Sequence, residues 1–239
     1  MSPRGQTGDK AAGAGRGGAP TRRSYHHGDL RNALVEAATQ LVRAGGPEAL
    51  VLREVARETG VSSTAAYRHF ESHKDLVEAV KEQAGQVMVQ RVRDELAASS
   101  PSDDPVAEAL RRIDASGRGY VRFALTEPGL FRLMFRERAQ AGGTAARLAV
   151  RPKTPAEDRD ASYMVMADAL DALVDLGALS AERRPFADIS LWAGVHGLSV
   201  LLIDSQLAAL PEDIRQAVID RTFDVLVHGV YSDPKLAPG

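Results

Sequence analysis

The spacing of the apolar residues limits what this chain can fold into more strictly than any other feature of its sequence. From residue 28 onward, apolar side chains recur at i, i+3, i+4, i+7 and i+8, the repeat of a helix with one buried face. No segment alternates apolar and polar residues with the period of two that a half-buried strand requires. The sequence therefore predicts an all-α protein. The first apolar stripe consists of Leu30, Ala33, Leu34, Ala37, Ala38, Leu41 and Val42.

Glycine, proline and capping residues set the ends of the predicted helices. Gly45-Gly46-Pro47 ends the first helix, because glycine accepts a left-handed cap and proline cannot continue the turn. Short helices are expected at 52–59 and 63–69, the second capped by Ser62 or Ser63. Further helices are expected at 106–124, 130–138, 158–176, 186–208 and 211–230, with a loop over 139–157.

A long helix is predicted after the second short one. Ser72 and Asp75 have the spacing of a capping box, in which each side chain bonds the other residue's backbone N–H. The buried side of this helix is expected at Leu76, Val80, Val87 and Leu96.

Charge is distributed unevenly along the chain, although its net value is only −2. Residues 1–75 hold 11 Lys and Arg against 8 Asp and Glu, and residues 76–239 hold 19 against 24. A basic front on an acidic body favours a phosphate-binding N-terminal end. Residues 1–24 are rich in glycine and arginine without an apolar period, and we expect a disordered basic arm that either contacts DNA or only aids solubility.

Composition also excludes several classes of protein. Without cysteine there is no disulfide framework and no thiolate chemistry. No apolar run approaches the roughly 18 residues of a membrane span, and no secretory signal opens the chain. We therefore expect a cytoplasmic protein without a membrane partner.

The two short helices have the geometry of a DNA-reading helix-turn-helix. Gly60 permits the sharp turn between them, and Val61 fills the angle where they meet. Small residues at the start of the second helix let its backbone approach base edges, and the polar residues after them can reach phosphates. Such corners also occur in all-α proteins that bind no DNA. The candidate contacts are Ser63, Thr64, Ala65, Ala66, Tyr67, Arg68 and His69.

Several ordered motifs over residues 25–80 resemble the DNA-binding domain of the TetR family of transcriptional regulators. They are Tyr25-His26-His27-Gly28-Asp29-Leu30-Arg31, Leu52-Arg53-Glu54-Val55-Ala56, Gly60-Val61-Ser62 and Tyr67-Arg68-His69-Phe70. The resemblance implies a recognition helix around Thr64–His69, a contact from Arg53 on the preceding helix, and Phe70 in the core. It divides the chain into the arm at 1–24, a helix-turn-helix domain at 25–80 and an effector-binding and dimerisation domain at 81–239.

Two positions depart from the family pattern. Val51 stands where a capping Ser or Thr is common, so the helix after it lacks a side-chain cap worth about 1 kcal/mol. Three residues after Phe70 the family usually has lysine, but this chain has His73 followed by Lys74. Either residue could make the phosphate contact at that helix start. Lys74 is favoured because histidine is mostly uncharged near neutral pH.

The C-terminal part is similar, less specifically, to the effector domain of a TetR subgroup with a Trp–His–Gly signature. The similar segments are Glu127–Phe135 and Trp192–Leu198, where Val195 separates Gly194 from His196. Aromatic and methionine side chains in this half could line a ligand cavity or simply fill a core. Trp192 and His196 share one helix face, and His196 is the expected polar anchor. The candidate ligand contacts are Tyr120, Phe123, Phe131, Met134, Phe135, Tyr163, Met166, Trp192 and His196.

The resemblance implies a homodimer formed by the last two helices, which would place two recognition helices on operator half-sites about 34 Å apart or a multiple of that. It favours a repressor that an unknown small molecule releases from double-stranded operator DNA. The alternatives are an enzyme acting in the helical cavity and a non-specific architectural DNA binder. The sequence has no nucleophile elbow, phosphate loop or metal-binding helix motif, and His69 with His73 lacks accompanying ligands. We therefore expect no catalysis, cofactor or metal.

Overall fold

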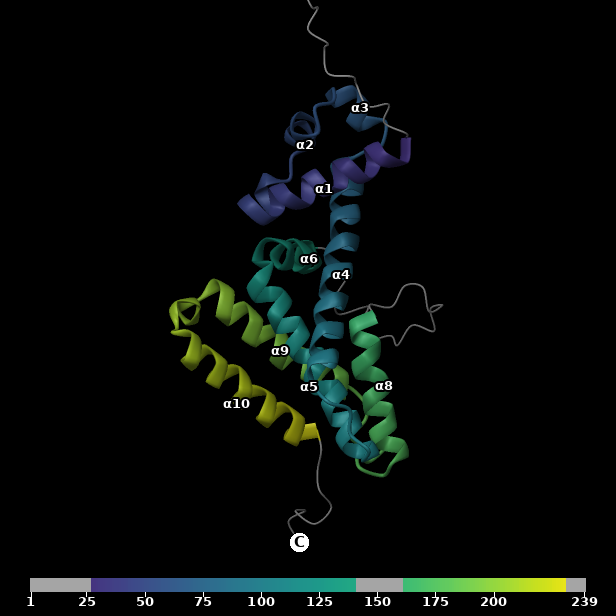
Figure 1. Cartoon of the computed structure of the whole chain (residues 1–239), viewed down its shortest axis with the longest axis vertical. Coiled ribbons are helices and arrows are strands. Elements are labelled where there is room, and N and C mark those ends of the chain that lie inside the picture. Colours follow the sequence, from purple (N-terminus) through teal and green to yellow (C-terminus); the bar gives the residue numbers. More distant parts are fainter. Residues whose placement is uncertain (1–26, 141–160, 231–239) are drawn as a thin grey trace, which may run out of the picture.

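The computed structural model describes residues 27–140 and 161–230, and every regular element within these ranges is a helix (Figure 1). The predicted all-α fold is confirmed. The predicted arm at 1–24 lies outside the described residues, as does the predicted loop from residue 141 onward.

Three helices and one 3-10 turn form the N-terminal part. They are α1 (His27–Gly45), η1 (Pro47–Ala49), α2 (Leu52–Glu58) and α3 (Ser63–Tyr67). The apolar stripe of α1 is buried along Leu34, Ala38 and Val42, as its period predicts. Gly46, directly after α1, takes φ of 73° and ψ of −172°, a conformation that favours glycine. The turn η1, which the sequence did not predict, begins at Pro47.

Helix α4 (His73–Ala98) joins this part to the rest of the molecule (Figure 1). We call α1–α3 with the first turns of α4 the head, and the remainder the body. Ser72 and Asp75 form the predicted capping box at the start of α4. One row of buried positions advances by four residues, through Leu76, Val80, Ala84, Met88 and Val92, and Val77 and Ala79 are buried beside it. Val87 and Leu96, predicted to be buried, are only partly so, because the stripe drifts around the helix.

The body contains α5 (Pro105–Thr126), α6 (Pro128–Gln140), α8 (Ala161–Asp175), α9 (Ala187–Asp204), the short η3 (Gln206–Ala209) and α10 (Glu212–Val230). Helix α5 lies at its centre and packs against α4, α8, α9 and α10. Gly119 allows α5 to approach α4 closely, since a Cβ there would lie 2.6 Å from the backbone of Val92. Two apolar clusters result, one shared by head and body and one between α5, α8 and the start of α9.

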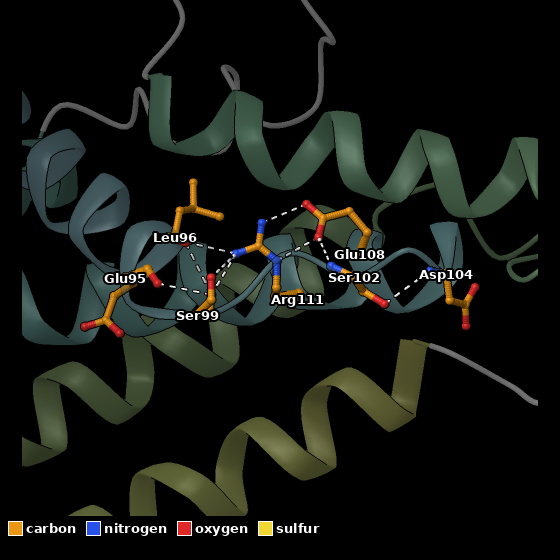
Figure 2. A network of polar contacts seen from close by, with 7 residues as sticks. All are labelled: Glu95, Leu96, Ser99, Ser102, Asp104, Glu108 and Arg111. Atoms are coloured by element: carbon orange, nitrogen blue, oxygen red, sulfur yellow. Dashed lines mark hydrogen bonds and ion pairs between the residues drawn. The ribbon is translucent and has the colours of Figure 1, made fainter.

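A polar network fixes the corner between α4 and α5 (Figure 2). The Arg111 guanidinium donates to the Leu96 carbonyl at 3.0 Å and to the Ser99 hydroxyl at 2.7 Å, which satisfies groups at the end of α4. Glu108 accepts two hydrogen bonds from Arg111 and one from the Ser102 backbone N–H. These bonds lower the pKa of Glu108 to about 2.

Helix α9 is long and apolar enough to cross a membrane by length and composition, a test that core helices of soluble proteins also pass. In this protein α9 packs against α5, α8 and α10. Its predicted range of 186–208 is divided, since the helix ends at Asp204 and η3 follows.

Candidate nucleic-acid interface and ligand pocket

Local interactions determine the turn between α2 and α3. Gly60 has φ of 69°, a conformation that residues with a Cβ rarely adopt. The Val61 N–H donates to the Ala56 carbonyl at 2.9 Å, which closes the turn. Of the two serines that the sequence offered as caps, Ser62 caps α3 by accepting the Ala65 N–H at 3.1 Å. The helix-turn-helix geometry thus follows from three consecutive residues, Gly60, Val61 and Ser62.

One face of α3 points to solvent at the end of the head farthest from α8 and α10 (Figure 1). Tyr67 has 52% of its surface exposed, and Ala65 and His69 are partly exposed. The regular helix ends at Tyr67, two residues earlier than predicted. The other exposed side chains beside Tyr67 are Ser63, Thr64 and Arg68.

Ala66 requires a correction. The sequence grouped it with the DNA contacts, but it is completely buried. It packs in the same apolar cluster as Phe70, four residues later, and that spacing was the available signal. Its side chain holds α3 against the head and is unavailable to DNA.

Two further candidate contacts flank α3. Arg53 is exposed on α2, whose N-cap Val51 makes no side-chain cap, as the sequence predicted. At the start of α4, His73 Nε2 lies 2.7 Å from the Leu50 carbonyl oxygen, so this ring links α4 to the segment before α2. Lys74 is exposed and makes no hydrogen bond or ion pair within residues 27–140 and 161–230. Of these two residues, Lys74 has the more accessible charge.

In the body, aromatic side chains gather around His196. Its ring stacks on Trp192 with centroids 5.0 Å apart and on Phe131 at 5.5 Å, and Phe135 meets it edge-on at 4.8 Å. The Tyr120 hydroxyl and His196 Nδ1 are hydrogen-bonded at 2.8 Å. Burial lowers the pKa of His196, so the imidazole is uncharged near neutral pH.

The structure divides the predicted ligand contacts. Tyr120, Phe131, Phe135, Trp192 and His196 come together as expected. Phe123 and Met134 are buried in the core shared by head and body.

Two candidates lie elsewhere, which corrects the grouping. Met166 belongs to the second apolar cluster, with Ile113 and Leu170. Tyr163 donates its hydroxyl hydrogen bond to Asp188, away from His196. Both residues lie on α8, which packs against the part of α5 around Ile113, whereas Tyr120 farther along α5 contacts His196. Helical periodicity alone does not reveal this placement.

A pocket of about 320 Å³ opens beside the ring of His196. Its lining includes residues that sequence reasoning missed, because they come from separate elements and have no local motif. Arg132 donates to the Asp204 carboxylate through both Nε, at 2.8 Å, and Nη2, across 72 positions of sequence. The full lining is Pro47, Glu48, Phe131, Arg132, Phe135, His196, Val200 and Asp204.

Head and body make direct contact next to this pocket. A Cβ on Gly129 of α6 would lie 2.2 Å from the Val42 carbonyl oxygen of α1, so the backbones of the two helices are in close contact at this point. Arg43 of α1 donates to both carboxylate oxygens of Glu127 at 2.8 and 3.0 Å. The hydrogen bonds to Glu127 raise the pKa of Arg43.

The outer face of α10 carries an exposed apolar strip. Ile214 and Val225 are about half exposed, at 47% and 55% of their surface. A shallow groove of about 480 Å³ follows the strip and is lined almost entirely by apolar atoms. Its lining is Ile214, Ala217, Val218, Arg221, Thr222, Val225 and Leu226.

Solved structures of other proteins share this fold. A protein of unknown function from Rhodococcus sp. RHA1 is 22% identical, with 88% of this chain and 100% of that chain covered and a TM-score of 0.66. A putative TetR-family transcriptional regulator from Rhodococcus sp. is 17% identical, with 82% and 98% covered and a TM-score of 0.57. A TetR variant from Acinetobacter baumannii AYE in complex with minocycline is 17% identical, with 83% and 94% covered and a TM-score of 0.54.

Two family models match the sequence itself. The model for bacterial regulatory proteins of the tetR family matches residues 34–80, and that for a tetracyclin repressor-like C-terminal domain matches residues 113–226. Together they cover more than half of the 239 residues. The Trp–His–Gly subgroup is a finer assignment and stays a prediction. The exposed helix α3 follows the tight turn at Gly60, and the rest of the chain forms a helical body. One family model matches each of these two parts. The chain therefore belongs to the TetR family of DNA-binding regulators.

Proposed function

We propose that the protein is a homodimeric repressor that binds its operator through α3 and is released by a small molecule bound beside His196. The observation that carries the proposal is the exposed polar face of α3, combined with an apolar strip on α10 that no described residue covers. The polar face of α3 suits a DNA groove, and the apolar strip on α10 suits contact with another copy of the chain.

The DNA contacts follow from exposure. Thr64 and Tyr67 face outward from α3, where a methyl or hydroxyl can reach base edges or phosphates. Arg53 and Arg68 add cationic side chains on either side. We assign the phosphate contact at the α4 start to Lys74, since His73 is engaged by the Leu50 carbonyl.

The dimer contact is assigned to α9 and α10. Exposed apolar strips of this kind on a soluble domain mark protein interfaces. Gly194 supports the arrangement inside one chain, since a Cβ there would lie 2.6 Å from the Leu226 side chain and keep α9 and α10 apart. A two-fold axis through the strip, running along the long axis of the molecule, would place two copies of α3 on one side of the assembly (Figure 1).

The ligand role of the body is supported by the ring of aromatic side chains around His196 and by the adjoining pocket. A structural neighbour of this chain holds minocycline, which supports small-molecule binding by this architecture. Ligand and operator affinities are then linked, because a ligand that prefers one head arrangement lowers affinity for DNA that prefers another. A protein working on operator DNA belongs in the cytoplasm, the location that we propose.

One set of experiments tests this function. Sedimentation of the full chain should give a dimer, and Val225→Glu in the strip should give a folded monomer, whereas the exposed Val51→Glu in the head should stay dimeric. Footprinting on the gene's own upstream region should show two protected half-sites for the dimer and none for the monomer. A monomeric wild-type protein, or one that binds random duplex as tightly as any promoter fragment, would contradict the proposal and favour an architectural binder.

A further inference from the structure

The pocket beside His196 is formed by both functional parts of the molecule. Pro47 and Glu48 of η1 supply the head side, whereas α6 and α9 supply the body side. Its volume of about 320 Å³ is at the small end of the range for ligand pockets. An occupant would therefore touch head and body at the same time.

Two phenylalanine rings contribute to the apolar surface of the pocket, beside Pro47 and Val200. Phe131 and Phe135 have ring centroids 4.9 Å apart, and both rings contact His196. Flat side chains at these separations accept another flat ring by stacking or edge contact. The pocket is therefore suited to a planar aromatic molecule of one or two rings.

His196 supplies one hydrogen-bonding position. Its Nδ1 is occupied by the Tyr120 hydroxyl, and its Nε2 has no hydrogen-bond partner in the part of the chain that the structure describes. Because the imidazole is uncharged, Nε2 acts as a donor in one tautomer and an acceptor in the other. The ligand needs one polar atom in the plane of its ring.

Arg132 and Asp204, which we call the rim of the pocket, determine the preferred charge of the ligand. The Arg132 guanidinium is bound by Asp204 through two of its nitrogens and also donates to the Ile203 carbonyl at 3.3 Å. A ligand carboxylate would have to compete with Asp204 for this cation while lying near the negative charges of Asp204 and of Glu48, which also lines the pocket. An uncharged ligand faces no such competition.

We propose that this junction pocket binds an uncharged planar aromatic molecule of one or two rings through His196 Nε2, and that the bound molecule bridges η1 to α6 and α9. The bridge reaches the DNA-reading helices through Leu50, which follows η1 and whose carbonyl is bonded to His73 at the start of α4. That the bridge controls DNA affinity rests on the proposed repressor function; binding itself does not.

Calorimetry on the full chain without DNA tests the chemistry, with isoquinoline as the acceptor probe, indole as the donor probe and 2-naphthoate as the anion. At least one neutral probe should bind, at least tenfold more tightly than 2-naphthoate. His196→Phe, which keeps a ring but removes Nε2 together with the Nδ1 that the Tyr120 hydroxyl contacts, should weaken that probe at least tenfold. Failure of both neutral probes to bind at millimolar concentration overturns the proposal.

A specificity switch tests the rim. Asp204→Asn frees Arg132, so 2-naphthoate should gain at least tenfold in affinity while the neutral probe changes little. Asp175→Asn, at the last residue of α8 as Asp204 is of α9, is the matched control and should change neither. An unaltered order of affinities in Asp204→Asn refutes the role given to the Arg132–Asp204 pair.

Hydrogen exchange tests the bridge. Binding of the neutral probe should slow amide exchange in residues 46–51 of the head as well as in α6 and α9. Protection confined to the body contradicts bridging. If the probe binds but operator affinity stays the same, the site stands without the regulatory link; if the wild-type dimer binds no operator at all, the proposed function fails separately.

Discussion

The head and the body place their candidate functional side chains in different ways. In the head, Thr64, Tyr67 and Arg68 stand exposed on a short helix whose start, turn and end are determined by residues within one stretch of about ten. In the body, His196 is positioned by Tyr120 and Phe131, which come from helices more than 60 residues away. Exposed side chains on a locally fixed frame can change with little effect on stability, whereas buried ones between distant helices cannot.

The close backbone contact between α4 and α5 in the body provides the largest expected effect. Gly119→Ala places a methyl group 2.6 Å from the Val92 backbone, so α4 and α5 must separate, at a cost of about 3 kcal/mol of unfolding free energy. Gly85→Ala, on α4 with open space around it, should stabilise the protein by about 0.5–1 kcal/mol through its higher helix propensity. Urea denaturation measures both. Equal effects of the two substitutions would show that the α4–α5 contact is looser than described.

The exposed face of α3 should show the reverse behaviour, with a large effect on operator affinity and a small effect on stability. Arg68→Ala removes an exposed cation, and we expect operator affinity to fall by about 1–2 kcal/mol while the unfolding free energy stays within about 0.5 kcal/mol. Arg93→Ala, an exposed arginine in the body part of α4, is the control and should change neither quantity. Fluorescence anisotropy on operator DNA and urea denaturation give the two values. A loss of stability equal to the loss of affinity would remove the contrast between head and body.

Helix caps test how locally the head is determined. Ser62→Ala deletes the cap of α3 and should cost about 1 kcal/mol of unfolding free energy. Val51→Ser supplies the cap that α2 lacks, at an exposed position with extended backbone, and should add about 0.5 kcal/mol. Thermal unfolding with both variants separates these effects. A neutral Ser62→Ala would mean that tertiary packing, and not the cap, holds α3.

The smallest effect is expected at the α4–α5 corner of the body. Arg111 lowers the pKa of Glu108 from the usual 4.5 to about 2, so the carboxylate favours the folded state above pH 4.5. That contribution is lost as the pH falls from 4.5 towards 2, because protonation removes the acceptor from Arg111. Glu108→Gln should therefore flatten the pH dependence of unfolding in this window only slightly, since the pair is only partly buried and water screens its charges. A steeper dependence in Glu108→Gln than in the wild type would reverse the sign of this effect.

Much of the head was predictable because its signals are local. Gly60, Ser62 and the Ser72–Asp75 capping box each act within three residues, and the structure confirms the turn and the box. The same reasoning failed for Ala66, because a small residue in a polar helix is compatible with a groove-facing or a core-facing position. Its spacing of four residues from Phe70 favours the core, and its contact with the cluster around Phe70 decides it.

For the body, the sequence predicted the positions of the helices but not which side chains form the pocket beside His196. Apolar period located α5, α6 and α9 to within a few residues, but it could not reveal which aromatic side chains meet. Met166 and Phe131 look alike as apolar positions, yet they lie in different clusters. The Arg132–Asp204 pair has no sequence signature at a separation of 72 positions.

The sequence by itself determined that this chain is helical, where its helices begin and which short segment has the form of a DNA-reading element. These properties depend on backbone conformation and on contacts within a few residues, and both are encoded in neighbouring side chains. Tertiary structure alone decided that Ala66 is buried, that His196 meets Phe131 and Tyr120, and that η1 forms a wall of the pocket. Those outcomes depend on how the helices pack against one another, which no single segment specifies.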